Sequence, residues 1–460
     1  MSDDLIFAIL DAAPFVMLGA LAILLFSGLP VAIILFGLGT TFSILGWLLG
    51  EMPTAAFFLI PGKLISALDG SLFYPAVVML LFMGVALERS GIAQDMLRCL
   101  RLLTGRAPGG MALSVLLIGV LLAPAAGVVG ASVVTLALIA LPEMLRAGYS
   151  APAASGAVAA AGTVGIILPP AVMLFFLAGE FQVPLGSMFM ATVMPGALLL
   201  TLYALWYMLS SRPSAEAPPP EASPTALAWA GLLTRGLLAP AGLIALVLGS
   251  IILGWATPSQ SGALGAAGAL LLTVLAGRFR LALFVELIET TARLSAMVFM
   301  IIMSAAVFSY PFRYFGGDTA VADALAALGL GPWQALLLIT FIVFVLGFFI
   351  DWIEITIITL PLFHPVLSAL DFSGHAPAGT TTLLWMAAVM ALTLQTSFLT
   401  PPFGFALFFL KGAAPPGVGL GAIYRGIAPI VAIQLAVIAL ALAWPPLVLW
   451  LPEQTYGTLR

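Results

Sequence analysis

The sequence predicts an all-α polytopic membrane protein with internal repeats. Its 460 residues are 63% apolar and 7% charged, whereas a soluble chain is roughly a quarter charged. The mean hydropathy is +1.21, and long unbroken apolar runs fit spanning helices of about 20 residues. These runs do not alternate between apolar and polar residues, so they do not predict the strands of a membrane barrel.

Taken in order, the apolar runs divide into single spans and two longer segments. They cover residues 5–26, 28–50, 72–88, 111–145, 151–176, 186–210, 232–253, 258–277, 292–311, 333–370, 380–410 and 426–451. The runs 111–145 and 333–370 are too long for one span, and neither has a polar turn at its midpoint. Each therefore predicts a re-entrant hairpin. The short mixed segments 53–70 and 281–291 predict interfacial arm helices.

A polar linker separates two similar halves of the chain. Residues 211–226 are rich in Pro, Ser and Glu, as extended linkers are. Three motifs of the first half recur in order in the second: Gly28-Leu29-Pro30 as Ala256-Thr257-Pro258, Leu141-Pro142 as Leu360-Pro361, and Pro169-Pro170 as Pro401-Pro402. Their near-constant offset indicates duplication. We expect a first repeat at 1–210, with hairpin 111–145 and broken helix 151–176, and a second at 227–460, with hairpin 333–370 and broken helix 380–410.

The positive charges predict how the repeats are oriented. If the arginine-rich stretch 89–106 is cytoplasmic and both long runs are hairpins, twelve of the fifteen Lys and Arg residues lie inside. The linker 211–226 is then cytoplasmic and both termini are periplasmic. The two hairpins open to opposite sides, so the repeats are inverted. Inverted repeats with hairpins and broken helices are the design of secondary transporters.

The two Pro-Pro segments carry the main chemical prediction. They are residues 161–170 (AGTVGIILPP) and 395–404 (QTSFLTPPFG). Adjacent prolines unwind a helix, and freed carbonyls in a bilayer are costly unless a ligand binds them. Carbonyl and hydroxyl oxygens suit Na⁺, while the positive end of the following half-helix suits a carboxylate. The alternative is a simple proline kink. Two such breaks at matching positions favour a binding site over a kink more strongly than a single break would.

The hairpin tips are a second class of predicted site. The first tip is small and hydroxylated over residues 127–135, although helix packing by small residues is an alternative explanation. In the second hairpin, Asp351 and Glu354 are the only charged residues between Trp333 and Pro361. Buried charge of this kind is usually functional, but the pair could simply be solvated at the interface. We expect Asp351 to cap backbone amides or attract Na⁺, and Glu354 to tolerate change better.

The predicted ion- and substrate-binding residues come from both breaks and both tips. They are Gly130, Ser132, Thr135, Gly162, Thr163, Gly165, Pro169, Pro170, Asp351, Thr396, Ser397, Thr400, Pro401, Pro402 and Gly404. The Na⁺ ligands among them are predicted to be Ser132, Gly165, Pro169, Thr396 and Thr400.

Several other classes of activity are excluded by what the sequence lacks. Neither lysine, Lys63 or Lys411, lies in a GxxxxGK[ST] loop, so transport cannot draw on a Walker A nucleotide site. One cysteine and two histidines give no disulfide and no HExxH pair. No GxSxG motif is present, so an intramembrane enzyme is disfavoured. The net charge of −4 predicts no nucleic-acid partner, and Na⁺ is the only cofactor expected.

Four ordered motifs resemble the large membrane subunit of tripartite ATP-independent periplasmic (TRAP) transporters. They are residues 130–132 (GAS), 162–170 (GTVGIILPP), 256–265 (ATPSQSGALG) and 399–404 (LTPPFG). The resemblance covers essentially the whole chain. Residues 347–354 (GFFIDWIE) resemble the branch assigned to mannitol, chloroaromatic or 2-oxo acid uptake. Ala171 departs from the pattern, because many relatives carry a serine after the first Pro-Pro pair.

The resemblance implies an elevator-type, Na⁺-driven importer of small organic acids in a bacterial inner membrane. It also implies two partners, a four-helix small membrane subunit and a periplasmic substrate-binding protein. The alternative function is an ion or solute channel that uses the same broken helices. A channel filter is usually built from repeated rings around a pore axis, so the channel is the weaker hypothesis.

Overall fold

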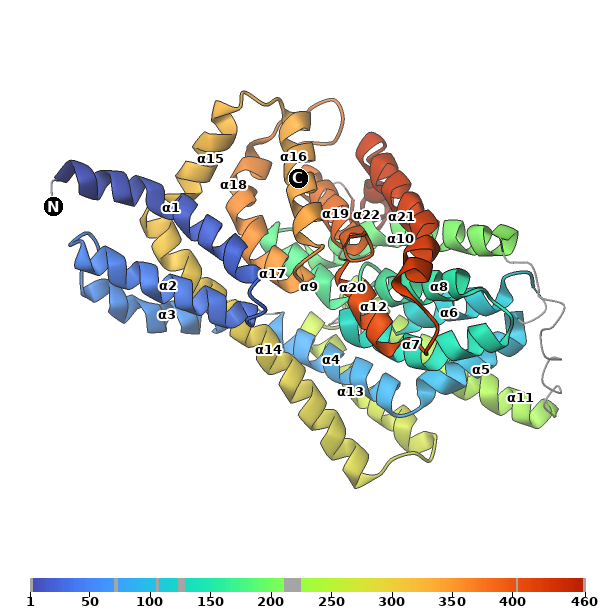
Figure 1. Cartoon of the computed structure of the whole chain (residues 1–460). Helices are drawn as coiled ribbons and strands as arrows, with labels where there is room; N and C mark the ends of the chain where they lie inside the picture. The colour runs from blue at the N-terminus through green and yellow to red at the C-terminus, as the bar shows by residue number, and fades with distance from the viewer. Residues whose placement is uncertain are drawn as a thin grey trace.

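A computed structural model describes residues 3–69, 73–104, 107–122, 129–210, 225–402 and 404–457. These residues form helices and connecting turns without a β-strand. The first half contains α1 (Asp3–Leu25), α2 (Val31–Leu48), α3 (Ala55–Asp69), α4 (Tyr74–Arg89), α5 (Ile92–Thr104), α6 (Gly110–Leu121), α7 (Val129–Arg146), α8 (Ala151–Val164), α9 (Val172–Glu180) and α10 (Leu185–Ser210). Figure 1 shows their arrangement. The predicted linker falls almost entirely outside the described residues.

The second half contains helices in a similar order, although its first three helical segments together form one span. It contains α11 (Ala226–Leu233), the π-helical turn η2 (Thr234–Leu238), α12 (Ala239–Ile252), α13 (Pro258–Leu275), α14 (Leu281–Tyr314), α15 (Gly317–Ala327), α16 (Pro332–Leu346), α17 (Trp352–Glu354), the π-helical turn η3 (Ile355–Thr359), α18 (Leu360–Ala369), α19 (Thr380–Ser397), α20 (Phe405–Ala413), α21 (Leu420–Ala443) and α22 (Pro446–Tyr456). Eight helices of the described chain are long and apolar enough to cross a membrane. A ninth candidate is the pair α4 and α5, bent by 64°. The predicted all-α polytopic fold is confirmed.

Local sequence explains where several of these helices begin. Thr257 starts α13 with a capping box, in which its hydroxyl accepts from the Gln260 amide at 3.3 Å. The Gln260 side chain in turn accepts from the Thr257 amide at 2.9 Å. Pro258 takes the first helical position, where a missing N–H costs nothing. The motif that opened the second repeat in the sequence is therefore a helix start.

Equivalent helices of the two halves exchange partners. Helix α4 packs on α13 and α2 packs on α14; likewise α8 packs on α21 and α19 packs on α10. Glycine permits the closest of these crossings. A Cβ on Gly156 of α8 would overlap the backbone of Gly426 on α21, and one on Gly39 of α2 would lie 2.6 Å from the Val307 carbonyl carbon on α14. The halves are therefore interlocked rather than separate domains.

Each half has a glycine turn between two helices at the same place in its order of elements. Gly91 joins α4 to α5 with φ of +79°, and Gly316 joins α14 to α15 with φ of +74°. Only glycine adopts such a conformation at low cost. These turns lead from the outer spans into the helices before each hairpin.

The sequence prediction of a separate arm helix at 281–291 was wrong. Helix α14 continues without a break from Leu281 to Tyr314, which makes it 34 residues long. At about 1.5 Å per residue it spans about 51 Å, much longer than the roughly 30 Å hydrocarbon core. The mixed residues at its start therefore extend an outer span. The first predicted arm, 53–70, does form a helix of its own, α3.

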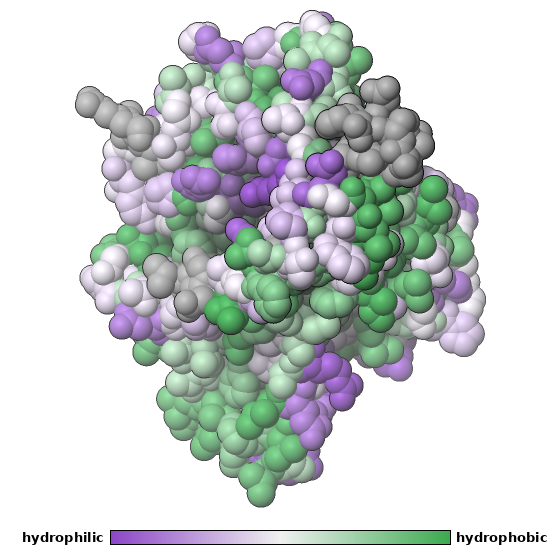
Figure 2. Space-filling model, turned by 90° about the vertical axis from the view of Figure 1, so that its left-hand side faces the viewer, coloured by the Kyte–Doolittle hydropathy of each residue, from purple (hydrophilic) through white to green (hydrophobic). Residues whose placement is uncertain are grey.

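Burial separates an inner group of helices from an outer group. All but two of the eighteen residues of α19 are buried, and so are eleven of fourteen in α8. By contrast, α1, α2, α13 and α14 expose large apolar side chains such as Ile23, Leu48, Leu275 and Leu281. Figure 2 shows one such face, largely apolar, with hydrophilic side chains gathered towards its upper part. The outer helices are therefore the ones suited to face lipid, while α8 and α19 are covered by other helices such as α6, α10, α16 and α21.

Candidate functional site

The first helix break lies between α8 and α9. Helix α8 ends at Val164, and the chain then turns with hydrogen bonds from Ile166 N to Thr163 O and from Ile167 N to Val164 O at 3.2 and 3.3 Å. The Pro169–Pro170 bond is cis. Within the described chain, the carbonyl oxygens of residues 166–170 accept no hydrogen bond. The break therefore leaves buried acceptors free for a ligand.

The second break, between α19 and α20, also has a proline pair after a helix end, but Pro401 and Pro402 are exposed. Two of its carbonyls are occupied, because Phe398 O accepts from Ala406 N at 3.2 Å and Pro402 O accepts from Tyr424 Oη at 2.7 Å. Helix α19 ends at Ser397, and Leu399 N and Thr400 N donate to carbonyls three residues back at 3.2 and 3.1 Å. The Pro401–Pro402 bond is also cis. Gly404 precedes α20 with φ of +51°, a conformation that favours glycine. Phe403 lies outside the described residues.

The hydroxyl groups beside the breaks all donate back into their own helices. Thr163 donates to Ala159 O at 3.0 Å. Thr396 donates to Leu392 O at 2.8 Å, and Thr400 donates to Thr396 O at 2.9 Å. A hydroxyl has a single hydrogen, so each of these oxygens has only lone pairs left to offer. Such oxygens can bind a cation but cannot donate to an anion without rotating.

Each hairpin packs closely on the broken helix of its own half. A Cβ on Gly162 of α8 would lie 3.1 Å from the Cα atom of Val133 on α7. A Cβ on Gly347, at the second tip, would overlap Ser397 Oγ and lie 2.6 Å from Ser397 Cβ. Because Gly162 and Gly347 have no side chain, the hairpins can pack directly against the C-terminal ends of α8 and α19.

The first hairpin is formed by α6 and α7, and its turn at 123–128 lies outside the described residues. Ser132 is buried, and its hydroxyl has no hydrogen-bond partner among the residues that the structure describes. A Cβ on Gly130 would lie 2.8 Å from the ring of Phe409 on α20. Thr135 donates to Glu88 on α4. Thr135 therefore links α7 to α4, and its role in ion or substrate binding stays a prediction.

The second hairpin contains the two acidic residues that the sequence singled out. Asp351 is the N-cap of α17, and its carboxylate accepts from Trp352 N at 2.8 Å. Only 7% of Asp351 and 8% of Glu354 is exposed. The alternative of a solvated pair is therefore wrong, and the capping role predicted for Asp351 is present. Glu354 Oε2 has no partner in the described part of the chain.

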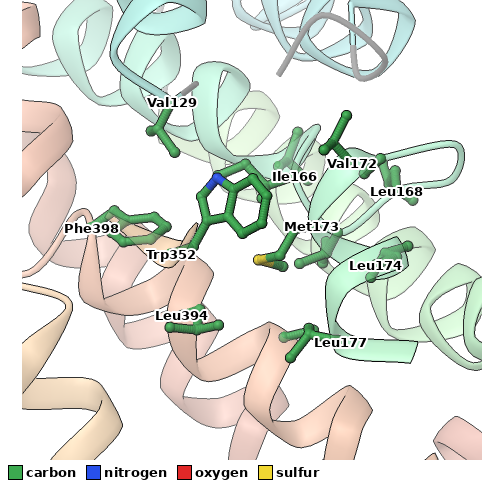
Figure 3. Packing of buried hydrophobic residues seen from close by; sticks show 14 of the residues in the cluster. Val129, Ile166, Leu168, Val172, Met173, Leu174, Leu177, Trp352, Leu394 and Phe398 are labelled. Carbon is green, nitrogen blue, oxygen red and sulfur yellow. The ribbon is translucent and has the colours of Figure 1, made fainter. Parts of the chain in front are cut away.

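Both hairpins and both breaks meet around Trp352. Figure 3 shows this indole between Val129 of the first hairpin, Ile166 of the first break, Met173 of α9 and Phe398 of the second break. All five side chains are at most 1% exposed. In Figure 1 the labels of α9, α17 and α20 likewise lie near one another at the middle of the molecule. One apolar cluster thus holds the four predicted site segments together.

Sequence reasoning missed three residues of this region. Trp352 was treated only as part of a motif, although its indole is the centre of the cluster. Gln395, one residue before Thr396, is fully buried, and neither its amide nitrogen nor its oxygen has a partner among the described residues. A lone amide in an otherwise apolar run was the available signal. Glu88 could not be found this way, because only the fold brings it to Thr135.

Paired hairpins and broken helices packed among apolar spans define a multi-pass membrane transporter. The family model for the tripartite ATP-independent periplasmic transporter, DctM component, matches residues 18–447. The chain belongs to this family. The family resemblance seen in the sequence is confirmed.

Several relatives are permeases of the same kind. The C4-dicarboxylate TRAP transporter large permease protein DctM of Pseudomonas aeruginosa is 28% identical over 82% of this chain and 86% of that protein. The sialic acid TRAP transporter large permease protein SiaM of Vibrio cholerae is 25% identical over 94% and 97% of the two chains. The isethionate permease protein DctMQ of Oleidesulfovibrio alaskensis is 26% identical over 93% of this chain and 64% of that longer protein.

Solved structures support the fold alone. The YdaH transporter of Alcanivorax borkumensis superposes with a TM-score of 0.58 at 17% identity, over 85% of this chain and 89% of that chain. MtrF of Neisseria gonorrhoeae gives a TM-score of 0.56 at 16% identity, over 85% of both chains.

Proposed function

We propose that this chain is the large membrane subunit of a Na⁺-coupled importer of small organic acids. The observation that carries the proposal is the pair of matching helix breaks. The first break offers buried carbonyl oxygens, and the second leaves the carbonyls of residues 399–401 without a partner in the described chain. The threonine hydroxyls beside the breaks have already used their hydrogens within the helix. Oxygen lone pairs without donors suit a hard cation rather than an anion. Ser132, Gly165, Pro169, Thr396 and Thr400 are the proposed Na⁺ ligands.

The substrate anion needs a different kind of partner. The N-terminal ends of α9 and α20 follow the two breaks, and they supply the positive end of a helix dipole. Bound Na⁺ would add positive charge beside them, which makes anion binding dependent on the cation. This coupling is the physical reason for symport. The carboxylates, sialic acid and isethionate named for relatives support an organic acid as the substrate class.

The proposed assembly has two further components, in keeping with the word tripartite in the family description. They are a small four-helix membrane subunit against the outer helices and a periplasmic binding protein that delivers the substrate. The proposed location is the bacterial inner membrane, with both termini periplasmic and the linker 211–226 cytoplasmic. The proposed repeat boundaries are 1–210 and 227–460.

Uptake by the three components together in proteoliposomes tests the coupling ion. Accumulation of a carboxylate should require an inward Na⁺ gradient, and a panel of carboxylates would define the substrate. Thr396→Val and Thr400→Val should raise the Na⁺ concentration for half-maximal uptake, because each removes one hydroxyl oxygen. Full accumulation with K⁺ alone on both sides would show that the proposal is wrong.

We also propose an elevator movement, in which both hairpins and both broken helices slide past the outer helices. The contact between Thr135 on α7 and Glu88 on α4 crosses this boundary. In a Cys99→Ser background, cross-linking Thr135→Cys to Glu88→Cys with a bifunctional thiol reagent should arrest uptake.

The matched control joins two helices of the proposed static part. Arg89 on α4 and Glu286 on α14 form an exposed ion pair at 2.7 Å, and cross-linking cysteines at these positions should leave uptake unchanged. Normal uptake after complete cross-linking of the Thr135 and Glu88 positions would instead favour the channel with a fixed pore.

A further inference from the structure

A cavity of about 340 Å³ lies between the outer helix α1 and the second hairpin. Its walls come from α1, α15, α16 and the returning arm η3–α18. The volume is more than twice the roughly 150 Å³ of an apolar cavity that takes up benzene. The space is therefore large enough for a segment of hydrocarbon chain.

The lining of this cavity excludes water and substrate as occupants. Thr359 is its one polar side chain, and every other residue in the lining is apolar. A buried water needs two to four polar partners, and a carboxylate needs positive charge or donors. Neither is provided by these walls.

The cavity has a buried floor and an exposed mouth. The floor includes Leu21, Ile350 and Ile358, each at most 7% exposed, whereas Phe15 and Leu328 at the mouth are 51% and 59% exposed. The surface around it on α1 and α16 is also apolar, with Ile23 at 74% and Phe341 at 61% exposed. The cavity thus continues a lipid-facing surface and opens to the bilayer.

We propose that this cavity binds one acyl chain of a membrane phospholipid. A chain that enters loses no hydration, and it gains contacts with walls that would otherwise face a void. Because α1 and the hairpin supply opposite walls, the acyl chain separates the outer helices from a segment of the proposed moving part. Binding itself requires only that the chain lies in a membrane, and does not depend on Na⁺ coupling or elevator movement.

The test uses photolabelling in lipid nanodiscs. A phosphatidylcholine with a diazirine in its acyl chain should label α1, α15 and α18 at the cavity-lining residues several-fold more than other lipid-exposed helices. Ala324 lines the cavity and is exposed at its edge. Ala324→Phe should therefore reduce labelling of the opposite wall several-fold.

The control is Ala326→Phe on the same helix, which adds the same ring at a position outside the lining. Labelling should then match that of the parent.

Ala22→Phe fills the cavity from α1 and replaces Ala324→Phe if that variant does not give a monodisperse protein. Uniform labelling of all lipid-exposed helices, or unchanged labelling in both filled variants, would overturn the proposal. So would loss of the label when the small membrane subunit is present, because the cavity would then be a protein interface. Loss of uptake with intact labelling would count against the transport mechanism and not against lipid binding.

Discussion

Replacing Gly347 by alanine should detach the second hairpin from α19. The new Cβ would overlap Ser397 Oγ and lie 2.6 Å from Ser397 Cβ. Ser397 is fully buried and its hydroxyl donates to Leu394 O at 2.7 Å, so it has no free space to move into. Overpacking of this kind costs about 1–3 kcal/mol, a factor of roughly 5 to 150 in the unfolding equilibrium.

The free energy of unfolding can be measured by titrating the protein in mixed micelles with a denaturing detergent. Gly347→Ala should lose about 1–3 kcal/mol, and a second change, Ser397→Gly, should recover most of it because both clashing atoms are removed. Ser397→Gly alone should cost under about 1 kcal/mol, since it places glycine at a helix end. The free energy of unfolding is measured instead of uptake, because Ser397 is also a proposed binding residue and its replacement could change uptake directly.

The matched control is Gly412→Ala on α20, where an added Cβ meets nothing within 4 Å. Alanine there should be neutral or stabilising by up to about 1 kcal/mol. Two results would refute the reasoning. One is a Gly347→Ala protein as stable as the parent, and the other is a double variant no more stable than Gly347→Ala alone.

Three further outcomes follow from individual contacts. Asp351→Ala should lower stability by about 0.5–2 kcal/mol through loss of the cap on α17, while Asp351→Asn keeps an acceptor and should lose less; equal losses in unfolding titrations would contradict capping. Arg278→Lys should cost no more than about 1 kcal/mol, because the ion pair with Asp95 at 2.9 Å is partly exposed, and high salt should abolish the difference from the parent. Gly119→Ala should lower the yield of folded protein more than Gly347→Ala, because its Cβ would overlap the backbone of Ala161, which no side-chain change can remove; normal yield would refute this.

The sequence was most informative where backbone chemistry is decided locally. Two proline pairs in equivalent positions predicted two helix breaks, and the structure has a break at each because proline cannot continue the helical hydrogen bonds. Asp351 was likewise predicted to cap its own helix, which is a contact between adjacent residues. The ligands at the breaks stay a prediction.

The sequence was least informative where contacts depend on the assembled fold. Residues 281–291 are more polar than the apolar run that follows, but they contain no proline or glycine that would break a helix. Their polarity therefore reflects a different environment, and α14 continues through them. Thr135 was predicted only as a tip hydroxyl, and the fold also brings it within hydrogen-bonding distance of Glu88, 47 positions earlier. No local pattern encodes such a pairing.

The exchange of partners between the halves has a consequence for biosynthesis. Helix α8 crosses α21 where Gly156 meets Gly426, so its contact surface is completed only after about 270 more residues have been made. At roughly 5–20 residues per second, the wait is about 13–54 s. During that interval α8 has its hairpin neighbours α6 and α7 but lacks α21, so one face of small residues stays uncovered. The nascent first half must therefore be sheltered by the insertion machinery or by lipid, and truncation anywhere before α21 should yield a product that is cleared rather than stored.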